Sequence, residues 1–349
     1  GDDGRYVQEN ENVKFHQIPL TRTITPLRDL YCIILLYRLI KKERFDIVHS
    51  HTPKAGLVAM IAAWMARVPV RLHTVAGLPL IEATGIKKQI LVMVERLTYS
   101  FATKVYPNSF SMSDYISREF FSNTTKLKVL ANGSSNGIDL NYFSRNDSLL
   151  SESLALRCEL DISSSSKVGV FVGRLVGDKG INEMIEATAE IVERVCDFHL
   201  ILVGSFENEL DPLRAETYER IRMLSNIHVV GFQPDVRPCL LASDFLVFPS
   251  YREGFPNVPL QAGAMGLPSI VSNINGCNEI IVHEQNGLII PSKNKEALKE
   301  AMCRMIKDEK LFETLKERSR KSIEDRYDRT LVWEALLSEY RTQLKSHVH

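Results

Sequence analysis

One carboxylate lies at a sharp polar corner between two predicted elements, in a position suited to sugar chemistry. Glu253 follows the apolar run 240–248, which is short and turn-bounded like a buried parallel strand. A helix is predicted to open near Pro256 and Asn257, because proline suits the first helical position. The free amides of a helix start, together with the helix dipole, attract anions. With Gln261 about two turns into this helix, the segment predicts a seat for a phosphorylated sugar.

Two cations lie five residues apart between another predicted strand and a helix. Arg174 and Lys179 follow the strand 167–172 and the turn residue Gly173. Guanidinium and ammonium groups held by a tight turn can bind a diphosphate through charge-assisted hydrogen bonds. Taken alone, the pair is better explained as two solvated cations on a turn. Its combination with the Glu253 corner favours the diphosphate site, which would need neither a metal nor a cofactor.

Both segments resemble the retaining family-4 glycosyltransferases, which have the GT-B fold. Residues 247–268 look like that family's Glu-x7-Glu signature, whose first Glu holds the donor sugar and whose second holds the nucleotide ribose. Glu253 matches the first position but Gln261 stands at the second, so we expect weaker nucleotide binding without loss of catalysis. The pattern Gly-Arg-Leu-x3-Lys-Gly is similar to the family's pyrophosphate-binding turn, which stabilises charge on the leaving group. The resemblance implies Glu253, Arg174 and Lys179 as catalytic residues, with donor contacts from Gly173, Gly254, Phe255, Pro256, Asn257 and Gln261.

Two further turns are similar to donor-binding turns of this family. Phe232 follows the predicted strand 227–230, in the place of a loop that stacks on the nucleotide base. A buried core aromatic is the equally weighted alternative for this position. Asn278 and Glu279 occupy the place of the family's Gly-x-x-Glu turn near the sugar phosphate, and a helix cap explains them nearly as well.

Histidines follow two predicted strands in the first half of the chain. His73 ends the strand 70–74, and open α/β sheets bind ligands at the carboxyl ends of their strands. We expect its side chain to point toward the cleft between the domains, where the family has a catalytic histidine near the acceptor and the donor sugar. His49 and His51 are competitors for this role, because they also follow a strand. Alternatively, His51 and Lys54 lie on the acceptor side and contact its phosphate.

The composition is that of an ordinary globular protein. The chain has 349 residues, of which 44% are hydrophobic and 25% are charged, and this length suffices for two domains with sizeable cores. Six cysteines are scattered without a Cys-x2-Cys pair. This spacing argues against a disulfide or metal framework and suits a reducing cytoplasm.

The charge is unevenly distributed, although the total is zero. Residues 1–145 hold 19 lysines and arginines against 12 acidic residues, and the remainder holds 24 against 31. A basic first half could bind an anionic membrane or a lipid pyrophosphate. Chance variation of net charge between domains explains the difference equally well. No apolar run reaches the length of about 18 residues that spans a bilayer. We interpret the amphipathic stretch 87–103, with Ile90 and Leu97 on its apolar face, as a core-facing helix; a membrane-surface helix is the alternative.

Strands and helices alternate along the chain, which predicts parallel doubly wound sheets. The first plausible strand is 13–18, without a preceding apolar strand and glycine-rich turn, so we expect roughly 40 residues of the first domain to be absent. The expected α/β architecture is GT-B, with two Rossmann-like domains facing a cleft. Residues 1–147 form the acceptor-side domain, to which the helix in 330–349 returns, and residues 148–329 form the donor-binding domain.

The turn-rich segment 133–137 resembles bacterial surface-polysaccharide glycosyltransferases that act on lipid-linked sugars. The resemblance implies a retaining hexosyltransferase that uses a nucleotide-sugar donor, with UDP favoured, and a lipid-linked or saccharide acceptor in capsule or O-antigen assembly. We expect a cytoplasmic protein with at most peripheral contact with the inner membrane, and no nucleic-acid partner. One alternative is a non-catalytic nucleotide-sugar-binding protein. This alternative is compatible with the expected absence of the first part of the first domain and with Gln261 in place of a glutamate. The other is a sugar-nucleotide epimerase, although its acidic and histidine constellation is not found.

Overall fold

The computed structural model describes residues 11–21, 25–81, 83–121, 124–194, 197–207, 209 and 211–346. The chain divides into two compact units, which we describe separately. Unit 1 comprises residues 1–107, 113–128 and 336–349, and unit 2 comprises residues 108–112 and 129–335. Residues 129–147, assigned above to the first domain, therefore cluster with unit 2.

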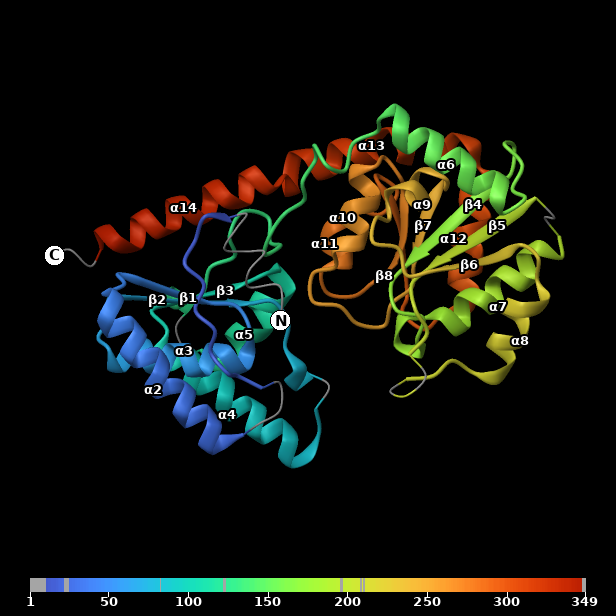
Figure 1. The fold of residues 1–349 in the computed structure, drawn as a ribbon. Coiled ribbons are helices and arrows are strands. Elements are labelled where there is room, and N and C mark those ends of the chain that lie inside the picture. Colours follow the sequence, from blue (N-terminus) through green and yellow to red (C-terminus); the bar gives the residue numbers. More distant parts are fainter. Residues whose placement is uncertain are drawn as a thin grey trace. The chain divides into compact units, whose positions relative to one another are not determined.

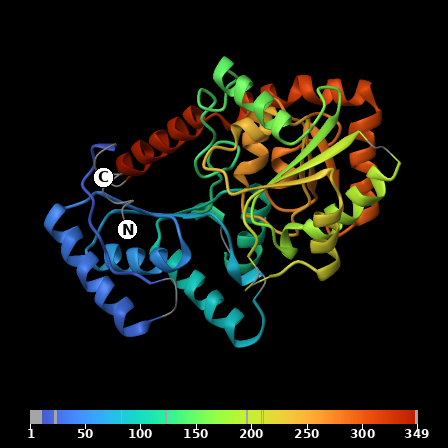
Figure 2. The same cartoon turned by 45° about the vertical axis from the view of Figure 1, so that its right-hand side comes forward.

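Unit 1 contains a parallel sheet of three strands in the order β1-β2-β3. The strands are β1 (Ile47–Ser50), β2 (Val70–Val75) and β3 (Lys104–Pro107). Helices α2 (Pro26–Glu43), α3 (Pro53–Met65) and α4 (Gly85–Phe101) form one layer along this sheet, with α3 packed against both α2 and α4 (Figures 1 and 2). The short helices η1 (Pro79–Ile81) and η2 (Thr124–Lys126) complete the connections, and α5 (Phe110–Phe120) has most of its residues in unit 1.

The last helix, α14 (Arg329–Lys345), has its second half in unit 1. There the carboxylate of Glu339, which is almost completely buried, accepts hydrogen bonds from the hydroxyl of Tyr106 at 3.1 Å and from the amide of Gln343 at 2.8 Å. Lys128 pairs with the same carboxylate. A buried charge needs such partners, so this cluster fixes the helix to the end of β3.

Unit 2 contains six parallel strands in the order β6-β5-β4-β7-β8-β9. The sheet grows in one direction from β4 through β5 to β6, and in the other direction from β7 through β8 to β9. The two directions meet between β4 and β7, and the crevice outside the carboxyl ends of two such strands is where doubly wound sheets bind ligands. The strands are β4 (Lys167–Val172), β5 (Phe198–Val203), β6 (Ile227–Gly231), β7 (Phe245–Phe248), β8 (Ser269–Ser272) and β9 (Gly287–Ile290).

Apart from the edge strand β6, the strands of unit 2 are largely buried on both faces, which explains their nearly continuous apolar sequences. At Gly169 in β4, an added Cβ would lie 3.2 Å from the ring of Phe198. The glycine therefore leaves room for the stacked rings of Phe198 and Phe245, whose centroids are 6.0 Å apart. The surrounding helices are α6 (Asp147–Glu159), η3 (Gly177–Lys179), α7 (Ile181–Val192), α8 (Ala215–Met223), α9 (Arg237–Leu241), α10 (Asn257–Ala264), α11 (Cys277–Ile280), α12 (Lys295–Lys307) and α13 (Glu309–Tyr327).

Two predicted strands are wrong. Residues 13–18 form no strand; they are largely exposed, and an extended segment without a sheet partner is not stabilised. The apolar run 240–248 starts inside helix α9, and only Phe245–Phe248 form strand β7. No described helix is both long and apolar enough to cross a membrane.

Candidate active site

The loops that follow β4 and β7 lie side by side at the point where the strand order reverses. The amide of Tyr251, after β7, donates to the carbonyl of Asp178, after β4, at 2.8 Å. At Gly180 an added Cβ would lie 2.3 Å from the carbonyl oxygen of Pro249, so only glycine allows the loops to approach this closely. The two sequence segments that suggested sugar and phosphate chemistry are therefore neighbours in unit 2.

Lys179 and Glu253, in the loops after β4 and β7, form an ion pair. The Nζ atom of Lys179 lies 2.5 Å from Oε1 of Glu253, and the two side chains are only 14% and 16% exposed. A charge that is largely removed from water needs a partner, and each of these side chains supplies it for the other. An anionic ligand placed here would compete with Glu253 for the ammonium group.

Arg174 is directed to a different acid. Its Nη1 lies 2.8 Å from Oε2 of Glu207, and about half of its side chain is exposed. The preceding residue, Gly173, has φ of +150°. Its carbonyl lies so close to Gly204, after β5, that a Cβ at Gly204 would meet it at 1.8 Å. This contact sets the direction of the chain that carries Arg174.

Helix α10 begins at Asn257 with Pro256 at its N-cap. Proline has no side-chain acceptor, so it cannot satisfy the first amides of the helix as serine or aspartate would. Such amides and the helix dipole favour an anion or a hydroxyl-rich ligand. Gly254 and Phe255 are half-buried in the turn before the helix, and Gln261 is half-buried within it.

The turn before α11 supports this loop. The side-chain amide of Asn275 donates to the carbonyl oxygen of Gly254 at 2.5 Å. An added Cβ at Gly276 would meet the same oxygen at 2.6 Å. Asn278 donates to the side chain of Asn273 at 2.9 Å. The turn therefore positions the backbone beside Glu253.

Glu279 caps the start of another helix. Its two carboxylate oxygens accept the backbone amides of Phe110 and Ser111, the first residues of α5, each at 2.9 Å. Both amides would otherwise lack an intrahelical partner, so a carboxylate there is stabilising. The sequence left two alternatives open for Glu279, a helix cap and a donor contact. In the structure its carboxylate caps helix α5, which is distant in sequence.

Phe232 follows β6 and is 73% exposed. The core alternative weighed for this aromatic residue is therefore wrong. An exposed ring after a strand of this sheet is available for stacking on a planar ligand.

His73 does not end its strand, contrary to expectation. It lies within β2, its side chain is 1% exposed, and its Nδ1 is 2.8 Å from the hydroxyl of Ser50. An added Cβ at Gly56 of α3 would lie 2.5 Å from its ring, so helix α3 covers the imidazole. Burial, with a smaller contribution from His51, lowers the pKa of His73 to about 4. The contact with Ser50 joins the covered imidazole to the end of β1.

The acceptor-side candidates have separate partners. The ring of His51 lies 4.3 Å from that of His49, and burial lowers the pKa of His51. Lys54, at the start of α3, pairs with Asp29 of α2 at 2.7 Å. Its charge is therefore already balanced within unit 1. In the described part of the chain, no three acidic, histidine or cysteine side chains are arranged to hold a metal ion.

Comparisons with known proteins decide the family. A model of group 1 glycosyl transferases matches residues 155–322, and a glycosyl transferase 4-like domain model matches residues 1–133. The capsular polysaccharide biosynthesis glycosyltransferase CapM of Staphylococcus aureus is 32% identical over 98% of this chain and 89% of its own length. The chain belongs to the family-4 glycosyltransferases.

Further similarities agree with this family. An Escherichia coli UDP-Gal:alpha-D-GlcNAc-diphosphoundecaprenol alpha-1,3-galactosyltransferase is 31% identical over 90% of this chain and 80% of its own length. The structure of Anabaena Alr3699/HepE in complex with UDP has a TM-score of 0.79 at 21% identity, over 91% of this chain and 84% of that one. A glycosyltransferase structure from Rickettsia africae also has a TM-score of 0.79, at 20% identity over 98% and 88% of the two chains. The glycosyltransferase has the GT-B fold.

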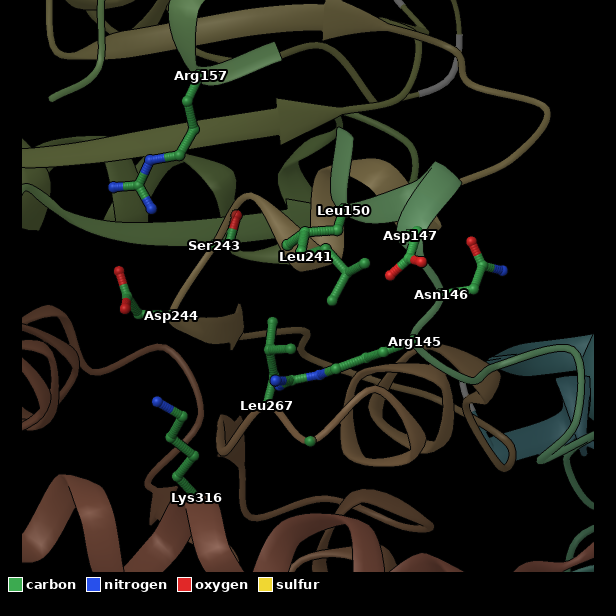
Figure 3. Close-up of a pocket in the computed structure, with 11 residues that line it drawn as sticks. Arg145, Asn146, Asp147, Leu150, Arg157, Leu241, Ser243, Asp244, Leu267 and Lys316 are labelled. Carbon is green, nitrogen blue, oxygen red and sulfur yellow. The ribbon is translucent and has the colours of Figure 1, made fainter. Parts of the chain in front are cut away.

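A hollow of unit 2 is shown in Figure 3. Its volume is about 360 Å³, and its walls include Asp244 and Leu267, which precede β7 and β8. Asp244 accepts the amide of Val168 at 2.8 Å, and Arg145 donates to the carbonyl of Met265 at 3.1 Å. These side chains hold the amino ends of strands together, so this hollow is not the crevice at the carboxyl ends.

A second ion pair, which the sequence did not indicate, joins the same two loops. Arg252 contacts Asp178 at 2.8 Å, and the amide of Asp178 donates to Asp211 at 2.6 Å. Both residues of the pair are adjacent to predicted site residues, Glu253 and Lys179. The only sign of this pair in the sequence was that each residue is next to a predicted site residue. Nothing in the sequence indicated that the two loops contact each other.

Proposed function

We propose that this glycosyltransferase transfers a hexose-type sugar from a UDP-linked donor to a lipid-linked saccharide, with retention at the anomeric carbon. The observation that supports this most is the Lys179–Glu253 pair at the carboxyl ends of β4 and β7. It combines a cation for a diphosphate with a carboxylate for sugar hydroxyls in one crevice. The relatives and the UDP-bound structural neighbour support the choice of substrates.

The donor's diphosphate would lie against Lys179, with Arg174 approaching from the same loop. As the bond from the anomeric carbon to the diphosphate breaks, negative charge grows on the departing oxygen. Fixed cations stabilise such charge in the transition state, and they do so without a divalent metal. In the proposed reaction the acceptor hydroxyl forms the new bond on the same face of the sugar, and its proton passes to the departing phosphate.

The rest of the donor would be held by the neighbouring turns. Glu253 and the amides at the start of α10 would bind sugar hydroxyls, and Gln261 would bind the ribose as a neutral acceptor. Phe232 would stack on the base. Glu253 positions the sugar in this proposal and does not attack it.

The acceptor is inferred from the relatives' names. The E. coli enzyme acts on a sugar linked to diphosphoundecaprenol, and a Campylobacter jejuni transferase with 25% identity over 93% of this chain acts on another such compound. A lipid-linked sugar places the reaction at a membrane surface. We propose the same class of acceptor here, in the assembly of a bacterial surface polysaccharide.

A donor and acceptor assay tests this function. The protein is incubated with UDP-glucose, UDP-galactose or their N-acetyl derivatives, with and without a polyprenyl-diphosphate-linked N-acetylglucosamine, in the presence of a chelator. Mass spectrometry detects the added hexose, and NMR of the product reports its anomeric configuration. We expect transfer with an α-linkage, which Glu253→Gln abolishes. Conversion of the UDP-sugar without acceptor would indicate an epimerase, and UDP binding without turnover would indicate a binding protein.

A further inference from the structure

The loops after β4 and β7 each carry two adjacent residues of opposite charge. The loop after β4 contains Asp178 followed by Lys179, and the loop after β7 contains Arg252 followed by Glu253. Lys179 contacts Glu253 at 2.5 Å, and Arg252 contacts Asp178 at 2.8 Å. The two ion pairs are therefore neighbours with opposite polarity, because each loop supplies the cation of one pair and the anion of the other.

The guanidinium group of Arg252 binds Asp178 through two N–H groups. Its Nε and Nη2 atoms donate to Oδ2 of Asp178 at 2.9 and 2.8 Å. Two donors on one carboxylate oxygen fix the direction of an arginine side chain as well as its position. The Asp178 side chain is 18% exposed and that of Arg252 is 53% exposed. The carboxylate is thus largely removed from water, and the guanidinium group supplies a charge that balances it.

The backbone of Asp178 is fixed on both sides. Its amide donates to Oδ2 of Asp211 at 2.6 Å, and its carbonyl accepts the amide of Tyr251 at 2.8 Å. At Gly177 an added Cβ would lie 2.8 Å from the carboxylate of Asp211, so a residue without a side chain lets Asp211 approach the loop this closely. Asp178 is therefore a fixed anchor for Arg252.

The alternation of charge favours one register of the two loops. A shift of one loop by one residue would place Lys179 opposite Arg252, or Asp178 opposite Glu253. Both arrangements bring like charges together, which costs free energy where water is partly excluded. The observed register is the one in which both pairs attract. The two pairs together specify where Glu253 lies relative to Lys179.

We propose that Arg252 and Asp178 are positioning residues, which keep Glu253 in place when the diphosphate of a donor binds Lys179. An anionic ligand draws the ammonium group of Lys179 away from Glu253, so this contact between the loops weakens as the donor binds. In the second pair the loop after β4 supplies the anion, which a diphosphate does not attract. The Arg252–Asp178 contact therefore holds the loops together in the complex.

This inference rests on the proposed function, which makes Lys179 the diphosphate site and Glu253 the sugar site. It predicts that Arg252→Met separates the binding of a UDP-sugar from the binding of UDP. UDP lacks the sugar that Glu253 would hold, so its affinity does not depend on where Glu253 lies. We expect Arg252→Met to weaken UDP-sugar binding about fivefold and to leave the Kd for UDP within about twofold, as suits a half-exposed ion pair.

A double-mutant cycle measured by isothermal titration tests the positioning role. The unsubstituted full chain, Arg252→Met, Asp178→Asn and the double variant are titrated with UDP, UDP-glucose, UDP-galactose and the two N-acetyl derivatives, in the presence of a chelator. We expect the two single variants to lose the same affinity for the UDP-sugar, and the double variant to lose no more than either. Arg304→Met is the matched control, because Arg304 pairs with Glu284 at 2.5 Å on other elements and should change neither Kd.

Three results would overturn the positioning role alone. They are an unchanged UDP-sugar affinity in Arg252→Met, an equal weakening of UDP and UDP-sugar, and additive losses in the double variant. An equal weakening would make Arg252 a direct contact of the diphosphate, and additive losses would show that the two residues act separately. An unsubstituted protein that binds UDP but none of the UDP-sugars would contradict the proposed function, and this inference with it.

Discussion

Glu253→Gln should tighten the binding of UDP, although it removes a residue of the proposed active site. In the free protein the carboxylate of Glu253 holds the ammonium group of Lys179 at 2.5 Å. UDP carries a diphosphate but no donor sugar, so Glu253 gains nothing from the ligand and competes with it for Lys179. The amide of glutamine keeps the shape of the side chain and removes the competing charge.

The size of the effect follows from the burial of the pair. Two unit charges about 4 Å apart attract by about 1 kcal/mol in water and about 4 kcal/mol at the effective dielectric of a protein surface site. Side chains that are 14% and 16% exposed lie between these limits, so we take about 2 kcal/mol. A diphosphate need not break the pair completely, and the Kd for UDP should fall by about tenfold, equivalent to about 1.4 kcal/mol.

The matched control is Glu207→Gln, which removes the partner of Arg174. That pair is 52% and 38% exposed, and exposed pairs contribute at most about 1 kcal/mol, so UDP affinity should change by no more than a few-fold. Isothermal titration in the presence of a chelator measures both variants. Unchanged or weaker UDP binding by Glu253→Gln would refute the competition between Glu253 and the diphosphate. Thermal unfolding should show that Glu253→Gln is also destabilised, because Lys179 loses its partner.

Three other predictions concern the remaining site residues. Arg174→Ala should reduce turnover about 10²-fold or more if its charge stabilises the departing phosphate, and near-normal steady-state rates would exclude that role. Gln261→Glu should tighten UDP binding in the same titration if this position contacts the ribose; unchanged affinity argues against the contact. Burial lowers the pKa of His49 to about 3 and that of His73 to about 4, below the unfolded value of 6.5. Their stabilising contribution is therefore complete above pH 6.5 and is lost as the pH falls toward 4, by about 2–3 kcal/mol at pH 5.5; equal unfolding free energies from denaturant titrations at pH 7.5 and 5.5 would contradict this.

Several strands were predictable from local sequence alone. Residues 167–172, 198–203 and 269–272 are short apolar runs, and the structure has strands with these bounds. Helices α5 and α8 were not anticipated, because α8 is dominated by polar and charged residues and its apolar pattern is weak. Leu240 and Leu241 were assigned to a strand but lie in helix α9. Their apolar character was misleading, because a buried helix and a buried strand have similar apolar sequences.

The site was predictable only as separate segments. The sequence indicated Lys179 and Glu253 individually, but their ion pair joins positions 74 residues apart and depends on β4 and β7 being neighbours. The burial of His73 likewise depends on Gly56 of α3, whose missing side chain lets the helix cover the ring. Long-range pairings of this kind arise from the topology of the sheet, which no local pattern specifies.

We propose above that the cations after β4 hold the diphosphate of a nucleotide-sugar donor. Metal-free calorimetric titration with UDP, GDP and ADP tests it most directly when it is repeated on Lys179→Met. Lys167→Met is the matched control, because Lys167 lies at the other end of β4 and pairs with Glu309. We expect selective UDP binding that Lys179→Met weakens at least tenfold and Lys167→Met leaves unchanged. Equal UDP affinity in the unsubstituted protein and Lys179→Met would contradict it.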